Sequence, residues 1–239
     1  MQPWKLQPAR DHGLSLVDSF RSLHRENGLV AAGFHFAWWS AVRGYLKAWH
    51  RLHIHGRDHV PLQPPFILIA NHTSHLDSLV LAAAVPWHLH DRLFPIAAGD
   101  VFFETSSRSA LSALLLNALP LWRKKCGGHA LQQLRQRLLD EACCYILFPE
   151  GTRSRDGALQ PFKNGLGMLI AESNVPVVPC YLQGCFDALR PDQLWPRPRP
   201  IHVYVGQPAT FQHVPNTRPG WQQIAASLEA AMKGLMPSK

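Results

Sequence analysis

Short apolar runs alternate with longer stretches of helical periodicity along most of this chain. The run Phe66–Ala70 is too short for a helix and follows Pro65, so it predicts a buried strand. The next stretch, Ser78–Ala84, predicts a helix that ends before Pro86. Further strands are predicted at residues 92–98, 145–148, 176–182 and 202–205, and further helices at 107–117, 129–140, 165–173 and 221–235. Strands that alternate with helices predict an α/β fold.

The N-terminal region has a different pattern. Residues 29–52 predict an amphipathic helix with an aromatic stripe and a cationic side, which includes Arg43 and Lys47. This pattern suits a helix at a bilayer interface, although an ordinary helix packed on the domain has the same pattern. We expect residues 1–56 to form membrane-associating helices and residues 57–239 to form the main domain. The aromatic stripe consists of Trp38, Val42, Tyr45, Leu46 and Trp49.

Composition and charge limit the class of protein and its partners. The 239 residues are 46% hydrophobic and 17% charged, which is typical of a globular protein. The net charge is +8, and residues 1–56 carry seven Lys and Arg against three Asp and Glu, a net +4. Basic proteins favour anionic membranes, nucleic acids or acidic proteins. No nucleic-acid motif is present, so we expect no nucleic-acid partner.

Three further features of the chain bear on its compartment and surface. No apolar run reaches 18 residues and no signal-peptide core follows Met1, so we expect neither a spanning helix nor a secreted protein. Five cysteines without a Cys-x-x-Cys pair favour reduced thiols. The run Pro191–Pro200 predicts a rigid surface loop, to which we assign no docking role.

Candidate chemistry follows the first predicted strand. Residues 71–77 read Asn-His-Thr-Ser-His-Leu-Asp, which places His72 and Asp77 on a turn between a strand and a helix. A carboxylate that accepts one imidazole N–H makes the histidine a general base. A metal site from His72, His75 and Asp77 is the alternative. The spacing does not fit the His-x-His-x-Asp-His pattern of metallo-hydrolases, so we predict no metal.

A second polar stretch follows another predicted strand. Residues 148–154 read Phe-Pro-Glu-Gly-Thr-Arg-Ser. Gly151 lets a ligand approach the backbone closely, and Arg153 offers two parallel N–H donors to an anion. This stretch predicts a site for an anionic or polyol group.

Together the two stretches resemble the glycerolipid acyltransferase family, whose best-known class is the 1-acyl-sn-glycerol-3-phosphate acyltransferases. The resemblance extends over residues 65–179, with Phe162-Lys163-Asn164-Gly165 and Val175–Pro179 similar to two further blocks of the family. It implies a mixed central sheet flanked by helices. It also implies phospholipid biosynthesis at the cytoplasmic face of a membrane, by a peripheral or monotopic enzyme.

The resemblance also implies a reaction. A fatty acyl group moves from acyl-CoA or acyl carrier protein to a hydroxyl of a lysophospholipid, most simply 1-acylglycerol-3-phosphate, with no cofactor. His72 is the base and Asp77 holds it. Members of the family have Gly-x-x-Phe before the arginine that is similar to Arg123, and here Asn117 and Pro120 stand at those positions. The substrate-binding residues that the resemblance implies are Arg123, Glu150, Gly151, Thr152, Arg153 and Lys163.

Other functions stay open at this point. The same His72–Asp77 pair would activate water in a lipid or thioester hydrolase. The acceptor would be glycerol-3-phosphate or a lyso-aminolipid if the head-group site differs from that of the family. A membrane adaptor without activity would use the basic, aromatic N-terminal region but would not need both polar stretches.

Overall fold

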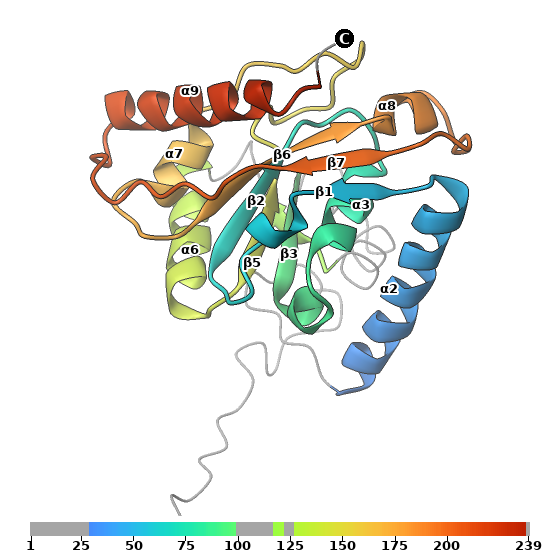
Figure 1. Cartoon of the computed structure of the whole chain (residues 1–239). Helices are drawn as coiled ribbons and strands as arrows, with labels where there is room; N and C mark the ends of the chain where they lie inside the picture. The colour runs from blue at the N-terminus through green and yellow to red at the C-terminus, as the bar shows by residue number, and fades with distance from the viewer. Residues whose placement is uncertain (1–28, 99–116, 122–126, 238–239) are drawn as a thin grey trace, which may run out of the picture.

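A seven-stranded mixed sheet organises the molecule and carries helices on both faces (Figure 1). The computed structural model describes residues 29–98, 117–121 and 127–237. The strand order is β1-β7-β6-β2-β5-β3-β4, and among these neighbours β6 and β7 are antiparallel while all others are parallel. The predicted mixed sheet is therefore confirmed. The strands are β1 (His53–His55), β2 (Phe66–Ala70), β3 (Leu93–Ala98), β4 (Leu119–Leu121), β5 (Cys144–Leu147), β6 (Val177–Gln183) and β7 (His202–Val205).

Strand β2 lies at the centre and is buried along its whole length. Phe66 and Leu68 pack into the core on one face of the sheet, and Ile67 and Ile69 pack into the core on the other. A strand covered on both faces shows an uninterrupted apolar run, as the sequence does here. The parallel strands β5 and β6 flank β2, so the carboxyl ends of all three meet at one edge of the sheet.

Two groups of helices cover the two faces of the sheet. Helices α2 and α3 pack on one face, and α6, α7 and α9 pack on the other (Figure 1). The predicted helices at 78–84, 129–140 and 221–235 are confirmed with shifted ends, whereas the one at 107–117 lies almost entirely outside the described residues. The helices are α2 (Leu29–Trp49), η1 (Arg57–His59), α3 (Asp77–Ala84), η2 (Trp87–Arg92), α6 (Gly127–Asp140), α7 (Gly165–Ile170), α8 (Cys185–Ala188) and α9 (Arg218–Gly234).

Helix α2 belongs to the same core as the rest of the fold. Its residues Trp39, Val42 and Leu46 are buried in the cluster that covers α3 and one face of the sheet. Strand β1 lies within residues 1–56, which were predicted to be separate from the main domain, and it pairs with β7 of that domain. Within the described residues, no helix is both long and apolar enough to cross a bilayer. Membrane association of residues 1–56 stays a prediction.

The stripe that predicted α2 is split by the fold. Val42 and Leu46 face the core, whereas Tyr45 and Trp49 leave 37% and 48% of their surface exposed. One face of the helix therefore packs on the domain, and two aromatic side chains of its last two turns are exposed to solvent.

Candidate active site

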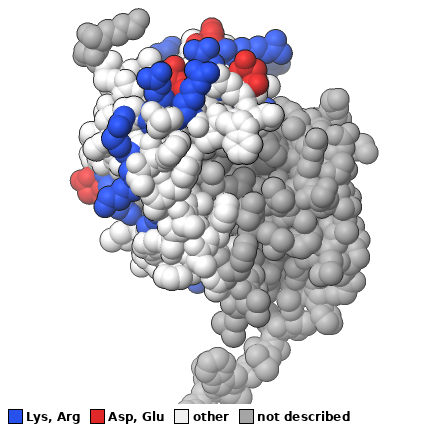
Figure 2. Space-filling view, turned by 90° about the vertical axis from the view of Figure 1, so that its right-hand side faces the viewer, with Lys and Arg blue, Asp and Glu red and all other residues white. Residues whose placement is uncertain are grey.

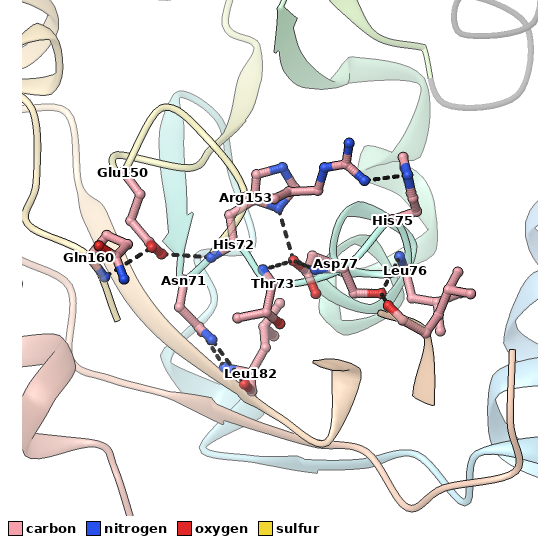
Figure 3. Close-up of polar contacts among 12 residues, drawn as sticks. Asn71, His72, Thr73, His75, Leu76, Asp77, Glu150, Arg153, Gln160 and Leu182 are labelled. Carbon is pink, nitrogen blue, oxygen red and sulfur yellow. Dashed lines mark hydrogen bonds and ion pairs between the residues drawn. The ribbon is translucent and has the colours of Figure 1, made fainter. Parts of the chain in front are cut away.

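The two polar stretches of the sequence lie side by side. Residues 71–77 leave the carboxyl end of β2, and residues 148–154 leave the carboxyl end of the neighbouring strand β5 (Figure 3). The backbone N–H of Ser154 donates to the carbonyl of His72 at 2.7 Å, which joins the two loops directly. Open α/β sheets bind their ligands at this edge.

His72 and Asp77 form the predicted pair. The His72 Nδ1 and Asp77 Oδ2 atoms are 2.9 Å apart, and Asp77 is fully buried at the first residue of α3. The same Oδ2 accepts the backbone N–H groups of Thr73, at 2.6 Å, and Ser74, at 2.8 Å. Together with His72, these donors hold the carboxylate in one orientation. The carboxylate is thus fixed before any substrate arrives.

The imidazole of His72 is fixed from a second side. Its ring stacks on the Phe148 ring, with centroids 4.1 Å apart and an interplanar angle of 16°. Donation of the Nδ1 proton to Asp77 leaves Nε2 as the basic nitrogen. The side chain of His72 keeps 20% of its surface exposed, so a ligand can reach it. The pair therefore has the arrangement of a general base.

Buried polar side chains hold the catalytic turn to the sheet. The Asn71 amide donates to the carbonyl of Leu182 at 3.0 Å and accepts its N–H at 2.7 Å, which ties the end of β2 to β6 (Figure 3). The Ser74 hydroxyl donates to the carbonyl of Leu189 at 2.7 Å. Both residues stand inside the recognised motif, yet the sequence reasoning gave them no role because their partners are more than 100 positions away.

Glu150 joins the two loops through its carboxylate. Its Oε1 accepts the backbone N–H of His72 at 2.7 Å, and its Oε2 accepts the N–H of Gln160 at 3.0 Å. Burial raises the pKa of Glu150 to about 7. The hydrogen bonds from the two N–H groups lower this pKa, but burial has the larger effect. Only 2% of the residue is exposed. In this arrangement Glu150 contacts backbone on both sides, and its predicted contact with the substrate stays a prediction.

Arg153 is held by a side chain of the other loop. Its Nη1 contacts Nε2 of His75, which is the middle histidine of the first motif (Figure 3). Burial, and then the charge of Arg153, lower the pKa of His75, so the imidazole is neutral and accepts the guanidinium N–H. The sequence analysis considered His75 only as a ligand in the metal alternative, and the structure places it as the neighbour of a predicted anion-binding residue.

The remaining predicted substrate-binding residues lie around this loop. Gly151 has φ 75°, and a Cβ atom there would approach Lys163 Nζ to 2.7 Å, so Lys163 lies directly over the loop. Thr152 is exposed. Arg123 lies outside the described residues. The structure thus brings Gly151, Arg153 and Lys163 together beside the His72–Asp77 pair.

The metal alternative finds no support in the geometry. In the described ranges, no group of three His, Cys, Asp or Glu side chains has an arrangement that would hold a metal ion. Nδ1 of His72 is engaged by Asp77, and His75 turns toward Arg153.

Sequence comparison identifies relatives of this chain. The profile of the Acyltransferase family matches residues 51–183, which is more than half of the chain and includes both motifs. A mouse protein named 1-acyl-sn-glycerol-3-phosphate acyltransferase alpha is 30% identical over 139 residues, which cover 57% of this chain and 47% of that protein. The human protein of the same name matches to the same extent. The chain therefore spans about half the length of these curated relatives.

Structural comparison supports the same grouping at the level of the fold. The crystal structure of the 1-acyl-sn-glycerophosphate acyltransferase PlsC from Thermotoga maritima aligns with a TM-score of 0.64 and 20% sequence identity. The alignment covers 92% of this chain and 85% of that one. The two proteins therefore have the same fold.

Proposed function

The chain belongs to the glycerolipid acyltransferase family, and we propose that it transfers a fatty acyl group from an acyl thioester to the free hydroxyl of 1-acylglycerol-3-phosphate. The observation that carries the proposal is the His72 Nδ1–Asp77 Oδ2 contact of 2.9 Å at the open end of β2. The names of the relatives supply the acceptor, because they are called 1-acyl-sn-glycerol-3-phosphate acyltransferases.

In the first step, Nε2 of His72 takes the proton of the acceptor hydroxyl. An alcohol is a weak nucleophile until a base removes its proton as it attacks. The oxygen attacks the carbonyl carbon of the thioester, and the imidazolium that forms is stabilised by Asp77. The Thr73 and Ser74 N–H groups keep this carboxylate in place during the proton transfer.

In the second step, the tetrahedral intermediate collapses. The new C–O ester bond stays, the C–S bond breaks, and the thiol leaves with the proton held by His72. The products are a diacyl lipid and a free thiol, and His72 returns to its starting state. The thioester is already activated, so the scheme has no acyl-enzyme stage and calls on no cofactor.

The polar end of the acceptor lies at the second loop in this proposal. Arg153 and Lys163 supply cations for the phosphate, and Gly151 lets the head group approach the backbone. Arg123 is a further phosphate ligand by its resemblance to the family. Glu150 is a positioning residue, because its two oxygens accept backbone N–H groups from both loops.

The donor and the location follow from the reaction. The donor is acyl-CoA or acyl carrier protein, both of which present the acyl group as a thioester. The acceptor is a lipid, so the site works at the surface of a membrane, and we place it on the cytoplasmic face. The net charge of +8 favours association with anionic lipid or with an acidic carrier protein.

One assay tests this proposal. Purified protein is given a labelled thioester and, in parallel, lysophosphatidate, glycerol-3-phosphate, a lyso-aminolipid or no acceptor, and the products are identified by mass. We expect diacyl product only with lysophosphatidate. Release of free thiol at the same rate without any acceptor would instead show a hydrolase. Product from another acceptor would show that the proposed head group is wrong and that the proposed acyl transfer is right.

A further inference from the structure

The most exposed large apolar side chains of the described structure lie on one loop. Leu194 and Trp195 are 90% and 84% exposed, and they lie between α8 and β7. Folding normally hides such side chains, so a pair that projects this far indicates a surface that something else covers. Prolines at 191, 196, 198 and 200 restrict the loop, which lowers the entropy lost when the loop is held against a partner.

Arginines accompany this apolar pair. Arg190, Arg197 and Arg199 are all exposed on the same loop, and Asp192 is its one exposed acid. Such a loop presents an apolar tip between cations. Trp is the residue that most favours the bilayer interface, where cations can meet lipid phosphates.

The loop joins the exposed end of α2. The carbonyl of Arg199 lies 3.2 Å from His50 Nδ1, and the N–H of Ile201 donates to the carbonyl of His50 at 3.0 Å. His50 directly follows α2, and Tyr45 and Trp49 are exposed in the last two turns of that helix. The two segments, 149 positions apart in sequence, therefore form one surface.

We call this the loop–helix surface. Viewed from the side where Figure 1 draws α2 and α8, Lys and Arg gather on the upper part of the described surface (Figure 2). Its two segments carry four exposed cations and one exposed acid, Asp192, and a second exposed acid, Asp187, lies on the neighbouring α8. The surface consists of Tyr45, Trp49, Arg51, Arg190, Leu194, Trp195, Arg197 and Arg199.

The loop–helix surface adjoins the active site. Its loop begins at Leu189, whose carbonyl accepts the hydroxyl of Ser74 in the catalytic turn at 2.7 Å. The same loop follows α8 and β6, and β6 ends at the edge where His72 lies. The start of this loop therefore contacts the catalytic turn directly.

We propose that the loop–helix surface seats the protein on an anionic lipid bilayer, with Leu194 and Trp195 inserted among the lipids and the arginines on the phosphates. The inference rests on the proposed function, because a lipid acceptor has to pass from the bilayer to His72. It also assigns a docking role to the proline-rich loop, to which the sequence alone gave none. An acidic protein is the less suitable partner, since two apolar side chains on a projecting loop offer no groove for it.

Vesicle flotation of the full-length protein tests the inference without any turnover. The vesicles are purely zwitterionic or contain anionic phospholipid, and lipid titration gives a partition coefficient. Leu194→Ala/Trp195→Ala should lower partitioning at least about tenfold on both vesicle types, because two apolar side chains no longer leave water. Arg197→Gln/Arg199→Gln should lower it roughly twentyfold on anionic vesicles at low salt and hardly at all on zwitterionic ones.

A matched variant controls for general loss of apolar or positive surface. Leu139→Ala/Arg218→Gln removes an exposed leucine and an exposed arginine from α6 and α9, which cover the opposite face of the sheet. This variant should partition like the unchanged protein. Circular dichroism verifies that every variant is folded. Deletion of residues 1–56 is a poorer test, because it removes β1 from the sheet.

Several outcomes would overturn the inference. Unchanged flotation of the Leu194/Trp195 variant would do so, and so would an equal loss in the control. If the variants lose binding to an acidic carrier protein but keep vesicle binding, the surface is a protein dock instead. If flotation behaves as expected but no acceptor is acylated, the proposed function fails while the lipid surface stands.

Discussion

The two loops of the candidate site differ in how firmly their functional side chains are held. The turn after β2 has its catalytic carboxylate buried, with three donors on one oxygen, and further bonds to β6 and to the α8 end. In the loop after β5, Thr152 is exposed, and the contact seen for Arg153 in the described structure is the one with His75. Both loops leave neighbouring strands at the same edge of the sheet.

This difference matches the two tasks we propose for the loops. Proton transfer needs reacting groups held within a fraction of an ångström, so its residues are fixed in advance by buried bonds. A head group can be met by long cationic side chains that adjust as it arrives. Glu150 connects the two, because it lies in the second loop and accepts an N–H of the first.

The largest expected effect on kinetics is at the turn after β2. Asp77→Asn should lower kcat by about 10³- to 10⁴-fold, because an amide favours the wrong imidazole tautomer and no longer stabilises the imidazolium. The carboxylate oxygen of Asp77 accepts three hydrogen bonds, and the amide that replaces the carboxylate brings N–H donors of its own. Steady-state kinetics measure this, with His72→Ala as the companion. The double variant should be hardly slower than either single one, and near-normal turnover of His72→Ala would rule out the mechanism.

The second-largest effect on kinetics is expected at the loop after β5. Arg153→Ala should raise KM for lysophosphatidate by about 10- to 100-fold, the value of one or two charge-assisted hydrogen bonds. The KM for the thioester should change little. Arg153→Lys keeps the charge but loses the paired donors, so its KM for lysophosphatidate should lie between those of the unchanged protein and Arg153→Ala. A phosphate-free acceptor is the control: an equal loss with it would show that Arg153 is structural.

The link between the loops should show in stability and its dependence on pH. Glu150→Gln leaves one of the two backbone N–H groups without an acceptor, which should lower the free energy of unfolding by about 1–3 kcal/mol in urea titrations. The pKa of Glu150 is about 7 in the folded protein, above that of an unfolded carboxyl. The folded state therefore holds a proton that the unfolded state has lost at intermediate pH.

It follows that the contribution of Glu150 to stability is largest at low pH and is lost as pH rises through about 7. The difference in unfolding free energy between the unchanged protein and Glu150→Gln should therefore shrink from pH 5 to pH 8. A difference that does not vary over this range would show that the carboxylate is ionised throughout.

The smallest effect is expected at His75. His75→Ala should leave kcat unchanged, because the side chain is no part of the pair that transfers the proton. It should raise KM for lysophosphatidate a few-fold, since Arg153 loses its neighbour. In the Arg153→Ala background the same substitution should do nothing further. A large loss of kcat, restored by added zinc, would revive the metal alternative.

Much of the fold could be predicted because the relevant forces are local. The run Phe66–Ala70 had to be a buried strand, and its bounds are those of β2. The catalytic turn was predictable because His72 and Asp77 are only five positions apart, so a single turn brings them together. Recognition of the family then supplied the roles of residues whose spacing alone assigns none.

Long-range contacts were decided only by the tertiary structure. Sequence placed Glu150 and Arg153 near the substrate, and it could not show that Glu150 is buried between two backbone N–H groups or that Arg153 faces His75. In the sequence, the proline-rich loop and the end of α2 are separate features with no sign of a contact between them. Their joint surface depends on a contact between His50 and Arg199, 149 positions apart, which no local periodicity records. Local pattern specifies each strand, helix and motif, whereas the choice of neighbours follows from how the sheet assembles.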